Sequence, residues 1–116
     1  VSFSSYDPWL ESTREFTGVY LYELLMYAGT EENDEVTVTV RARNEYEVTI
    51  GLDAVKKYGY LLSYMENGTR YVDMGVTPDN KGPLALAADI DDLDDAERET
   101  VATHLVWWVK EIIIAE

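Results

Sequence analysis

The chain contains no cysteine and one histidine among its 116 residues. Without cysteine it can form no disulfide, no thiolate metal ligand and no cysteine nucleophile. The single histidine, His104, excludes a metal site or a proton relay built on two imidazole rings. No residue pattern around His104 marks a nucleophile turn, so we predict a structural or surface histidine.

Basic side chains are scarce. Nine Lys and Arg residues face 23 Asp and Glu residues, which gives a formal net charge of −14. Nucleic-acid affinity comes largely from Lys and Arg at phosphate groups, so we expect no nucleic-acid partner. The same charge disfavours anionic membranes, and no segment approaches the roughly 20 apolar residues of a spanning helix. We therefore expect no membrane insertion.

The first residue is Val1 rather than methionine. This would fit the removal of a signal peptide or the trimming of a longer chain. The excess of acidic residues would fit an exported or salt-adapted protein. We expect a bacterial protein of the periplasm or a secreted one, with a cytoplasmic location as the alternative.

The length and the hydrophobic content together predict one folded domain over residues 1–116. Hydrophobic residues make up 47% of the chain, including three Trp and nine Tyr. A chain this rich in apolar and aromatic residues is not of the disordered class despite its charge. At 116 residues it can build one hydrophobic core, without a separate cofactor domain.

In the first half, two patterns are well defined. Residues 20–28 repeat apolar side chains at helical spacing and end at Gly29, which predicts a short amphipathic helix. Residues 36–41 and 46–50 alternate apolar and polar side chains, which predicts two strands joined as a hairpin. The preceding segment, residues 1–15, is mixed and polar, and we predict a loop or an edge segment anchored by Trp9.

Glycine marks the elements that follow. Asp53 is positioned to cap a short helix that runs to Tyr58 and ends at Gly59. Asn67-Gly68 supplies the positive-φ pair of a tight turn, which predicts a hairpin of residues 61–65 and 70–74. The first arm of this hairpin could instead finish a helix.

The last third begins with turn residues up to Gly82-Pro83, and residues 84–88 then read as a short buried strand. Residues 89–99 contain seven acidic residues and one arginine, which predicts a loop followed by a helix with an acidic face. Residues 106–114 are β-branched and aromatic on both faces, as in a central strand. These elements predict an α+β domain.

Several short motifs recur in a recognisable order and spacing along most of the chain. They are Arg43-Asn44-Glu45-Tyr46, Leu62-Ser63-Tyr64-Met65-Glu66-Asn67-Gly68, Gly82-Pro83-Leu84 and Trp108-Val109-Lys110-Glu111-Ile112. In this order the chain resembles the molybdopterin-binding domain of the sulfite oxidase family. The resemblance implies a mixed, twisted and partly rolled sheet with short helices.

The chain departs from that family at the residues that hold the cofactor. Full enzymes of the family bind a molybdenum cofactor through a cysteine thiolate, with an arginine after the Gly-Pro-Leu-like turn and a lysine before the tryptophan of the last strand. Here those two positions are Ala85 and Trp107, and no cysteine is present. These losses remove both metal ligation and charge pairing with the anionic cofactor. We therefore expect no cofactor and no catalytic residue, and the missing cysteine ligand argues against an enzyme.

The resemblance and these departures together favour a non-catalytic binding or accessory module with a molybdopterin-oxidoreductase-like fold. One alternative is a molybdopterin-binding oxidoreductase that holds its cofactor without a cysteine ligand. A second is a structural interaction domain whose edge strand or aromatic surface contacts another protein. The expected partner is thus a small anion or another protein, of unknown identity.

The candidate binding residues combine scarce cations with two polar groups of one family motif. This candidate anion or ligand pocket consists of Arg41, Arg43, Asn44, Tyr46 and Lys81. In so acidic a chain, gathered positive charge can mark a ligand site. The competing interpretation is that Arg41 and Arg43 neutralise nearby acids such as Glu45 and Glu47 on a solvent-exposed face.

Two further groups have competing interpretations. Five aspartates could give oxygen ligands to calcium, but their spacing lacks the glycine turn and terminal glutamate of an EF-hand loop, which favours a solvated acidic face. They are Asp89, Asp91, Asp92, Asp94 and Asp95. Four tyrosines could line a pocket or partner surface, although core and hairpin packing is the simpler role. They are Tyr58, Tyr60, Tyr64 and Tyr71.

Overall fold

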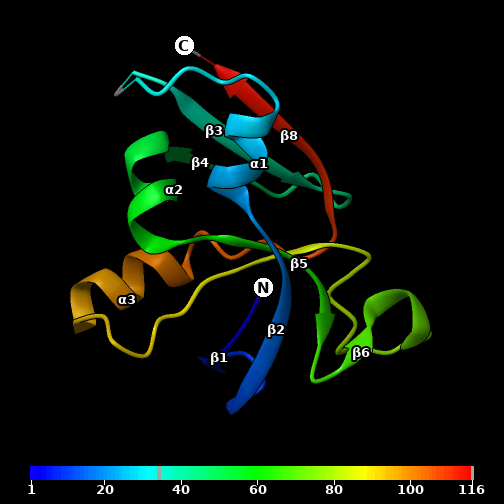
Figure 1. Cartoon of the computed structure of the whole chain (residues 1–116). Coiled ribbons are helices and arrows are strands. Elements are labelled where there is room, and N and C mark those ends of the chain that lie inside the picture. The colour runs from blue at the N-terminus through cyan, green and yellow to red at the C-terminus, as the bar shows by residue number, and fades with distance from the viewer. Residues whose placement is uncertain (34, 116) are drawn as a thin grey trace.

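The computed structural model describes residues 1–33 and 35–115, and within these ranges the strands form two sheets (Figure 1). The first sheet has the order β1 (Ser2–Asp7), β2 (Ser12–Tyr20), β5 (Leu61–Glu66), β6 (Thr69–Arg70). The short strand β7 (Ala85–Ala87) also pairs with β5. The second sheet has the order β4 (Glu47–Gly51), β3 (Thr37–Ala42), β8 (Val109–Ala115).

Three α-helices accompany these sheets in the described part of the chain: α1 (Leu21–Tyr27), α2 (Leu52–Tyr58) and α3 (Asp95–Ala102). A single 3₁₀ turn, η1 (Tyr71–Asp73), follows β6. Every strand pair described is antiparallel. The predicted α+β class is therefore confirmed, and the described strands lie in two antiparallel sheets rather than in one mixed sheet.

The hydrophobic core lies where α1 and α2 pack with the inner side chains of both sheets. Strand β3 alternates as predicted, and Val38 and Val40 are fully buried together with Val36, which precedes the strand. Tyr60, which directly precedes β5, belongs to the same cluster, as do Leu86 of β7 and Val101 of α3. Burying an aliphatic side chain of this size contributes about 1.5–3 kcal/mol.

The predicted helix from residue 20 to 28 is confirmed as α1, and the predicted helix ending at Gly59 as α2. Gly59 has a φ of 59°, the left-handed geometry that stops a helix where a side chain would be strained. The predicted Asp53 cap is wrong. Gly51 holds the N-cap position without a side-chain hydrogen bond, and Asp53 lies in the first turn, where its charge complements the helix dipole.

The second predicted hairpin is present but shorter than expected. Asn67 and Gly68 both have positive φ, at 51° and 80°, as a tight two-residue turn requires. The second arm ends as β6 at Arg70, and the chain then enters η1. Tyr71 is buried at that point, so core packing overrides the extended pattern.

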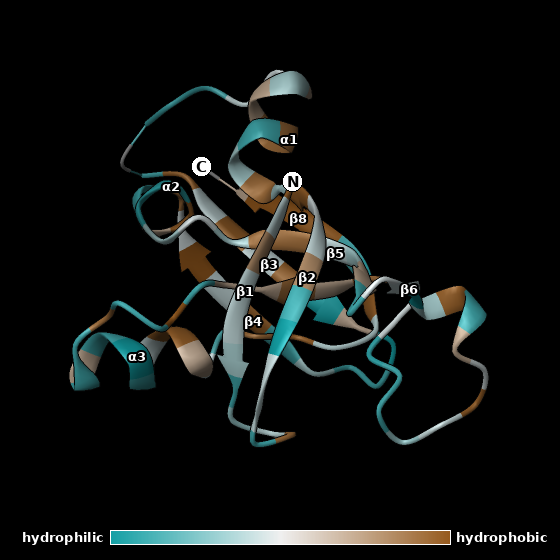
Figure 2. Ribbon diagram, turned by 60° about the horizontal axis from the view of Figure 1, so that its bottom comes forward, coloured by the Kyte–Doolittle hydropathy of each residue, from teal (hydrophilic) through white to brown (hydrophobic). Residues whose placement is uncertain are grey.

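The N-terminal segment forms a strand pair, with β1 at the edge of the first sheet. The alternative of a loop is therefore wrong and that of an edge segment is confirmed. In Figure 2 these two strands are coloured mainly neutral or hydrophilic. Ser5 and Asp7 are nevertheless buried, because their side chains form hydrogen bonds: Ser5 Oγ accepts from the Ile90 N–H, and Asp7 Oδ1 accepts from the Trp9 N–H.

The C-terminal strand is an edge strand, which corrects the prediction of a central one. Strand β8 pairs with β3, and the described strands provide no partner on its other side. Ile113 and Ile114 are correspondingly exposed. Trp107 and Trp108 precede the strand rather than belonging to it. Within the described ranges, no helix is both long enough and apolar enough to cross a membrane.

Candidate functional site

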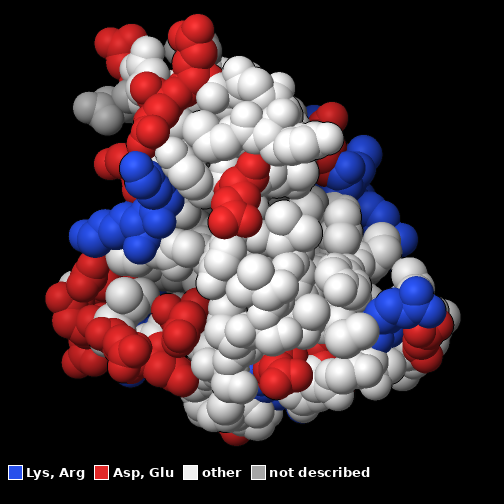
Figure 3. All heavy atoms as spheres, viewed as in Figure 1, with Lys and Arg blue, Asp and Glu red and all other residues white. Residues whose placement is uncertain are grey.

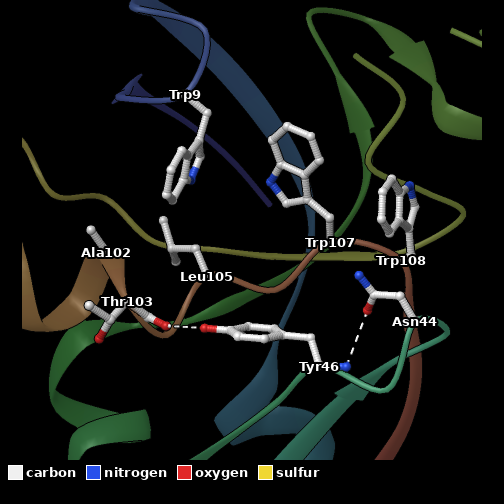
Figure 4. A pocket seen from close by; sticks show the side chains of 8 residues that line it. All are labelled: Trp9, Asn44, Tyr46, Ala102, Thr103, Leu105, Trp107 and Trp108. Atoms are coloured by element: carbon white, nitrogen blue, oxygen red, sulfur yellow. Dashed lines mark hydrogen bonds between the residues drawn. The ribbon is translucent and has the colours of Figure 1, made fainter. Parts of the chain in front are cut away.

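Three tryptophans and a tyrosine from separate parts of the chain surround an open groove of about 480 Å³, here called the aromatic groove (Figure 4). It lies between the β1–β2 turn, the β3–β4 turn, the end of α3 and the segment that leads into β8. Its lining residues are Trp9, Asn44, Tyr46, Ala102, Thr103, Leu105, Trp107 and Trp108.

Trp9 is positioned by the buried carboxylate of Asp7. Asp7 Oδ1 accepts hydrogen bonds from the main-chain N–H of Trp9 at 2.8 Å and of Leu10 at 3.3 Å. The main chain of the turn is therefore held by these bonds, while Trp9 as a whole residue is 62% exposed. The prediction that Trp9 anchors the N-terminal segment is therefore wrong: Asp7 is the buried residue that holds the turn, and Trp9 forms one wall of the groove.

The opposite wall is built around Trp108, whose φ of 58° is unusual for a residue with a side chain. Its main-chain N–H donates to the Lys81 carbonyl at 2.7 Å, and its carbonyl accepts from the Arg43 N–H at 3.0 Å. The indole N–H donates to the Asn80 carbonyl at 2.8 Å. These bonds fix Trp108, and the Trp107 ring stands nearly perpendicular to it at 82°, with centroids 6.2 Å apart.

Tyr46 extends across the groove from the β3–β4 turn toward the end of α3. Its hydroxyl donates to the Thr103 carbonyl at 3.1 Å, and its main-chain N–H donates to Asn44 Oδ1 at 3.2 Å (Figure 4). The side-chain oxygen of Asn44 is thus engaged within the turn, and the side-chain NH₂ group can still donate a hydrogen bond.

Next to the groove lies a set of four charged side chains, here called the buried ion network: Asp7, Arg14, Glu66 and Lys81. Lys81 Nζ lies 3.0 Å from Asp7 Oδ2 and 2.6 Å from Glu66 Oε1, and Arg14 Nε lies 2.8 Å from Glu66 Oε2. Two positive and two negative groups balance. Lys81 is 3% exposed, so its charge depends on these partners rather than on water.

Aromatic groups enclose the network. The Lys81 ammonium lies 5.0 Å from the ring centroid of Trp107 and 5.7 Å from that of Phe16, within the range of cation–π attraction. The Tyr71 hydroxyl bonds to Ser63 Oγ at 3.1 Å, and burial raises the pKa of Tyr71 above its usual value. The network therefore connects to the groove through Trp107.

The structure brings together two of the five residues predicted as an anion or ligand pocket. Asn44 and Tyr46 line the aromatic groove. Arg41 instead pairs with Glu47 at 2.9 Å and Glu111 at 2.6 Å across the second sheet, and the hydrogen bond and charge of Glu47 raise its pKa.

Lys81 is committed to the buried ion network. Arg43 is exposed, and its main chain alone touches the wall of the groove, through the Arg43 N–H to Trp108 carbonyl bond. The competing interpretation is therefore correct for Arg41 and not for Arg43.

Three of the acidic residues considered for calcium have local structural roles. Asp94 caps α3 by accepting from the Glu97 N–H at 2.8 Å, and Asp91 accepts from the Tyr6 N–H at 3.0 Å. Asp89 accepts from the Asp91 N–H at 3.2 Å. In the described ranges, no three His, Cys, Asp or Glu side chains form a group that could hold a metal ion.

On the face shown in Figure 3, acidic side chains gather over α3 and over the loop that follows α1. The solvated acidic face predicted for residues 89–99 thus appears over the helix, which begins at Asp95.

His104 lies outside the groove lining and bonds to a core tyrosine. The Tyr60 hydroxyl is 2.8 Å from His104 Nδ1. Burial lowers the pKa of His104 and raises the pKa of Tyr60, so both side chains are neutral near pH 7. The predicted structural role of His104 fits this bond. The predicted core packing holds for Tyr60 and Tyr71, which are buried, and for Tyr58, which packs against the core, whereas Tyr64 is exposed on hairpin strand β5.

Sequence reasoning did not place the tryptophans in a common site. Trp9 and the pair Trp107-Trp108 are about 100 residues apart in the chain, and no local pattern indicates that they converge. The one usable signal was the small number of tryptophans: the chain has three, and all three line the groove.

With the fold and the groove described, comparison with known proteins gives no relative: no family model and no curated protein matches this chain. The fit of a molybdopterin can still be judged from the residues present. The position expected to carry an arginine is the buried Ala85, Lys81 is neutralised by Asp7 and Glu66, and no thiolate exists. These residues do not fit the cofactor.

Proposed function

We propose that this chain is a non-catalytic binding module and that its ligand lies in the aromatic groove. The groove itself carries the proposal. A volume of about 480 Å³ lies within the range of small-molecule sites, and such sites combine aromatic walls with a few polar groups. Here the walls are indole rings and the polar groups are those of Asn44, Tyr46 and Thr103.

The chemistry of the lining favours binding over catalysis. No carboxylate, imidazole or amine is among the residues that line the groove. General acid–base and nucleophilic catalysis need such a group within hydrogen-bond reach of the reacting atom. The Thr103 hydroxyl donates to the Thr100 carbonyl at 2.6 Å, so this alcohol has no adjacent base.

The finer fold assignment is part of this proposal. We infer a sulfite-oxidase-like molybdopterin-binding fold that has lost its cofactor chemistry. The order of the sequence motifs supports it, as does the position of the Gly82-Pro83-Leu84 turn directly before β7. A bacterial periplasmic or secreted location belongs to the same proposal. A fold can persist after its original activity is lost.

The test is ligand binding to wild-type protein and to Trp9→Ala. A panel of flat aromatic compounds, with 2-naphthoate and 2-naphthylmethanol among them, should bind with dissociation constants near or below 1 mM, which corresponds to about −4 kcal/mol. Because the Trp9 ring forms a groove wall, Trp9→Ala should weaken binding about tenfold or more, as loss of a contact tryptophan does. Isothermal titration calorimetry measures both.

The matched control for this substitution is Tyr27→Ala. Tyr27 is 92% exposed at the end of α1 and does not line the groove, so its loss should leave binding unchanged. Equal binding by all three proteins would contradict the proposal. So would stoichiometric molybdenum or pterin fluorescence in protein purified from a host that makes the cofactor, since that result would favour the oxidoreductase alternative.

One observation favours a second candidate function, that of a protein-interaction domain. Among the described strands, β8 has a partner on one side only, and Ile113 and Ile114 are exposed on it. Such edges add strands from a second chain, while a net charge of −14 opposes association of two identical copies.

If β8 pairs with itself, sedimentation equilibrium in about 1 M salt, where the screening length is about 3 Å, should show a dimer. Ile114→Lys should abolish the dimer by placing a charge on this edge. Val72→Lys changes an exposed apolar residue elsewhere and should not. A monomer at every salt and protein concentration would contradict this self-pairing.

A further inference from the structure

Two indole N–H groups face the same part of the aromatic groove. In Figure 4 the ring nitrogens of Trp9 and Trp107 point toward the space between the two rings. Neither N–H has a hydrogen-bond partner in the described part of the chain, whereas the Trp108 N–H is satisfied by the Asn80 carbonyl. Because an indole nitrogen donates and cannot accept, the space between Trp9 and Trp107 calls for an acceptor.

One cation near the groove is also uncommitted. Among residues 1–33 and 35–115, every lysine and arginine except Arg43 has an ion pair or a side-chain hydrogen bond. The committed ones are Arg14, Arg41, Lys56, Lys57, Arg70, Lys81, Arg98 and Lys110. Arg43 precedes the lining residue Asn44, and its main chain is bonded to Trp108.

Aromatic walls often bind cations, but this groove is unsuited to one. The Lys81 ammonium already lies 5.0 Å from the ring centroid of Trp107. The Lys81 ammonium therefore already occupies one face of the Trp107 ring, and a second cation in the groove would have the positive ends of two N–H donors pointing toward it (Figure 4). An anionic oxygen would meet donors on both sides instead, and hydrogen bonds to ionised acceptors are the stronger kind.

Resting on the function proposed above, we propose that the ligand of the aromatic groove is a flat ring that carries a carboxylate. The ring packs between the aromatic walls, and the carboxylate oxygens accept from the Trp9 and Trp107 indole N–H groups. Arg43 adds attraction from the exposed side, which is screened by salt because the guanidinium is solvated. The net charge of −14 repels the carboxylate over a longer range. Salt screens this repulsion as well.

Nitrogen-15 NMR of the indole N–H signals tests this assignment, with three probes. These are 2-naphthoate, the uncharged 2-naphthylmethanol, and cyclohexanecarboxylate, which has the anion without the flat ring. We expect 2-naphthoate to bind at least about tenfold more tightly than either comparison compound. The Trp9 and Trp107 signals should shift downfield with naphthoate, and the Trp108 signal should stay, because its donor is already engaged.

Two variants separate the contributions of the groups involved. Trp9→Phe keeps an aromatic wall but removes one donor, so the preference for naphthoate over the alcohol should fall about three- to tenfold. Arg43→Gln should weaken naphthoate binding about two- to fivefold in low salt and leave the alcohol unaffected. Trp9 and Arg43 are both exposed, so neither change should unfold the protein.

The outcomes separate this inference from the proposed function. If the alcohol binds as tightly as naphthoate, with the same indole shifts, the carboxylate assignment is overturned while the groove remains a binding site. If cyclohexanecarboxylate matches naphthoate, the flat ring is overturned. If none of the three probes binds, neither the carboxylate assignment nor the binding function stands.

Discussion

Replacing Lys81 by methionine should lower the free energy of unfolding by about 3–5 kcal/mol. The Lys81 ammonium lies between Asp7 and Glu66, at 3.0 Å and 2.6 Å. Lys81 is 3% exposed, so water cannot take the place of the ammonium beside these carboxylates. Methionine fills a similar volume without charge. The change therefore leaves two carboxylates facing the single cation Arg14, and the buried ion network carries one uncompensated negative charge.

Urea denaturation followed by circular dichroism measures this loss, and Lys56→Met is the matched control. Lys56 pairs with Glu32 at 2.8 Å, but both side chains are more than half exposed, so its loss should cost at most about 1 kcal/mol. Adding Glu66→Gln to Lys81→Met makes the network neutral again, and part of the lost stability should return. Equal effects of the two lysine substitutions would show that Lys81 is not held as described.

Replacing Gly18 by alanine is expected to have the second largest effect, with a loss of about 3 kcal/mol. A methyl group at Gly18 would overlap the carbonyl oxygen of Leu62 and would lie 2.8 Å from the Ser63 Cα atom. Both are main-chain atoms of β5, which pairs with β2 at an irregular register between Thr17 and Gly18. The strands must separate locally to admit the methyl group, and pairing at the centre of the first sheet weakens.

Gly51→Ala is the control for this substitution. The methyl group there would approach Asp53 Oδ1 at 2.7 Å, which is the end of a side chain that can rotate away, and Gly51 already has a φ of −65°. Alanine at Gly51 should therefore cost at most about 1 kcal/mol, which reflects the preference for glycine over alanine at an N-cap. Thermal melts should place Gly18→Ala about 10 °C or more below wild type. Similar melting temperatures for the two variants would contradict the close approach of β2 to β5.

The elements that could be predicted from the sequence are those whose pattern and end signals agree. Helices α1 and α2 combine apolar spacing with a glycine stop, and β3 alternates apolar and polar residues without exception. The β1–β2 pair was missed as a hairpin because its buried positions include Ser5 and Asp7, whose burial depends on partners elsewhere in the chain. A strand with polar residues on its buried face gives no alternating hydrophobic signal.

The position of β8 in its sheet could not be predicted from its composition. Three consecutive isoleucines indicate burial on both faces, yet Ile113 and Ile114 are exposed at an open edge. For the site, the family resemblance directed attention to Asn44 and Tyr46, which do line the groove. The pairing of Arg41 with Glu47 was predicted as the competing interpretation. The pairs of Arg41 with Glu111 and of Lys81 with Asp7 and Glu66 could not be predicted, because the fold alone brings these partners close.

The buried ion network should also affect the rate at which the protein unfolds. Its contacts join residues 74 and 52 positions apart, in the pairs Asp7–Lys81 and Arg14–Glu66, so they close long loops. Contacts of this kind tend to form after the transition state of folding, since the entropy of closing the loops must be lost first. We therefore expect Lys81→Met to accelerate unfolding and to leave the folding rate nearly unchanged in stopped-flow experiments. Asp7 holds the Trp9 turn, and the Lys81 carbonyl holds Trp108. The groove would therefore stay intact for as long as the native state does, and the two lifetimes would be equal.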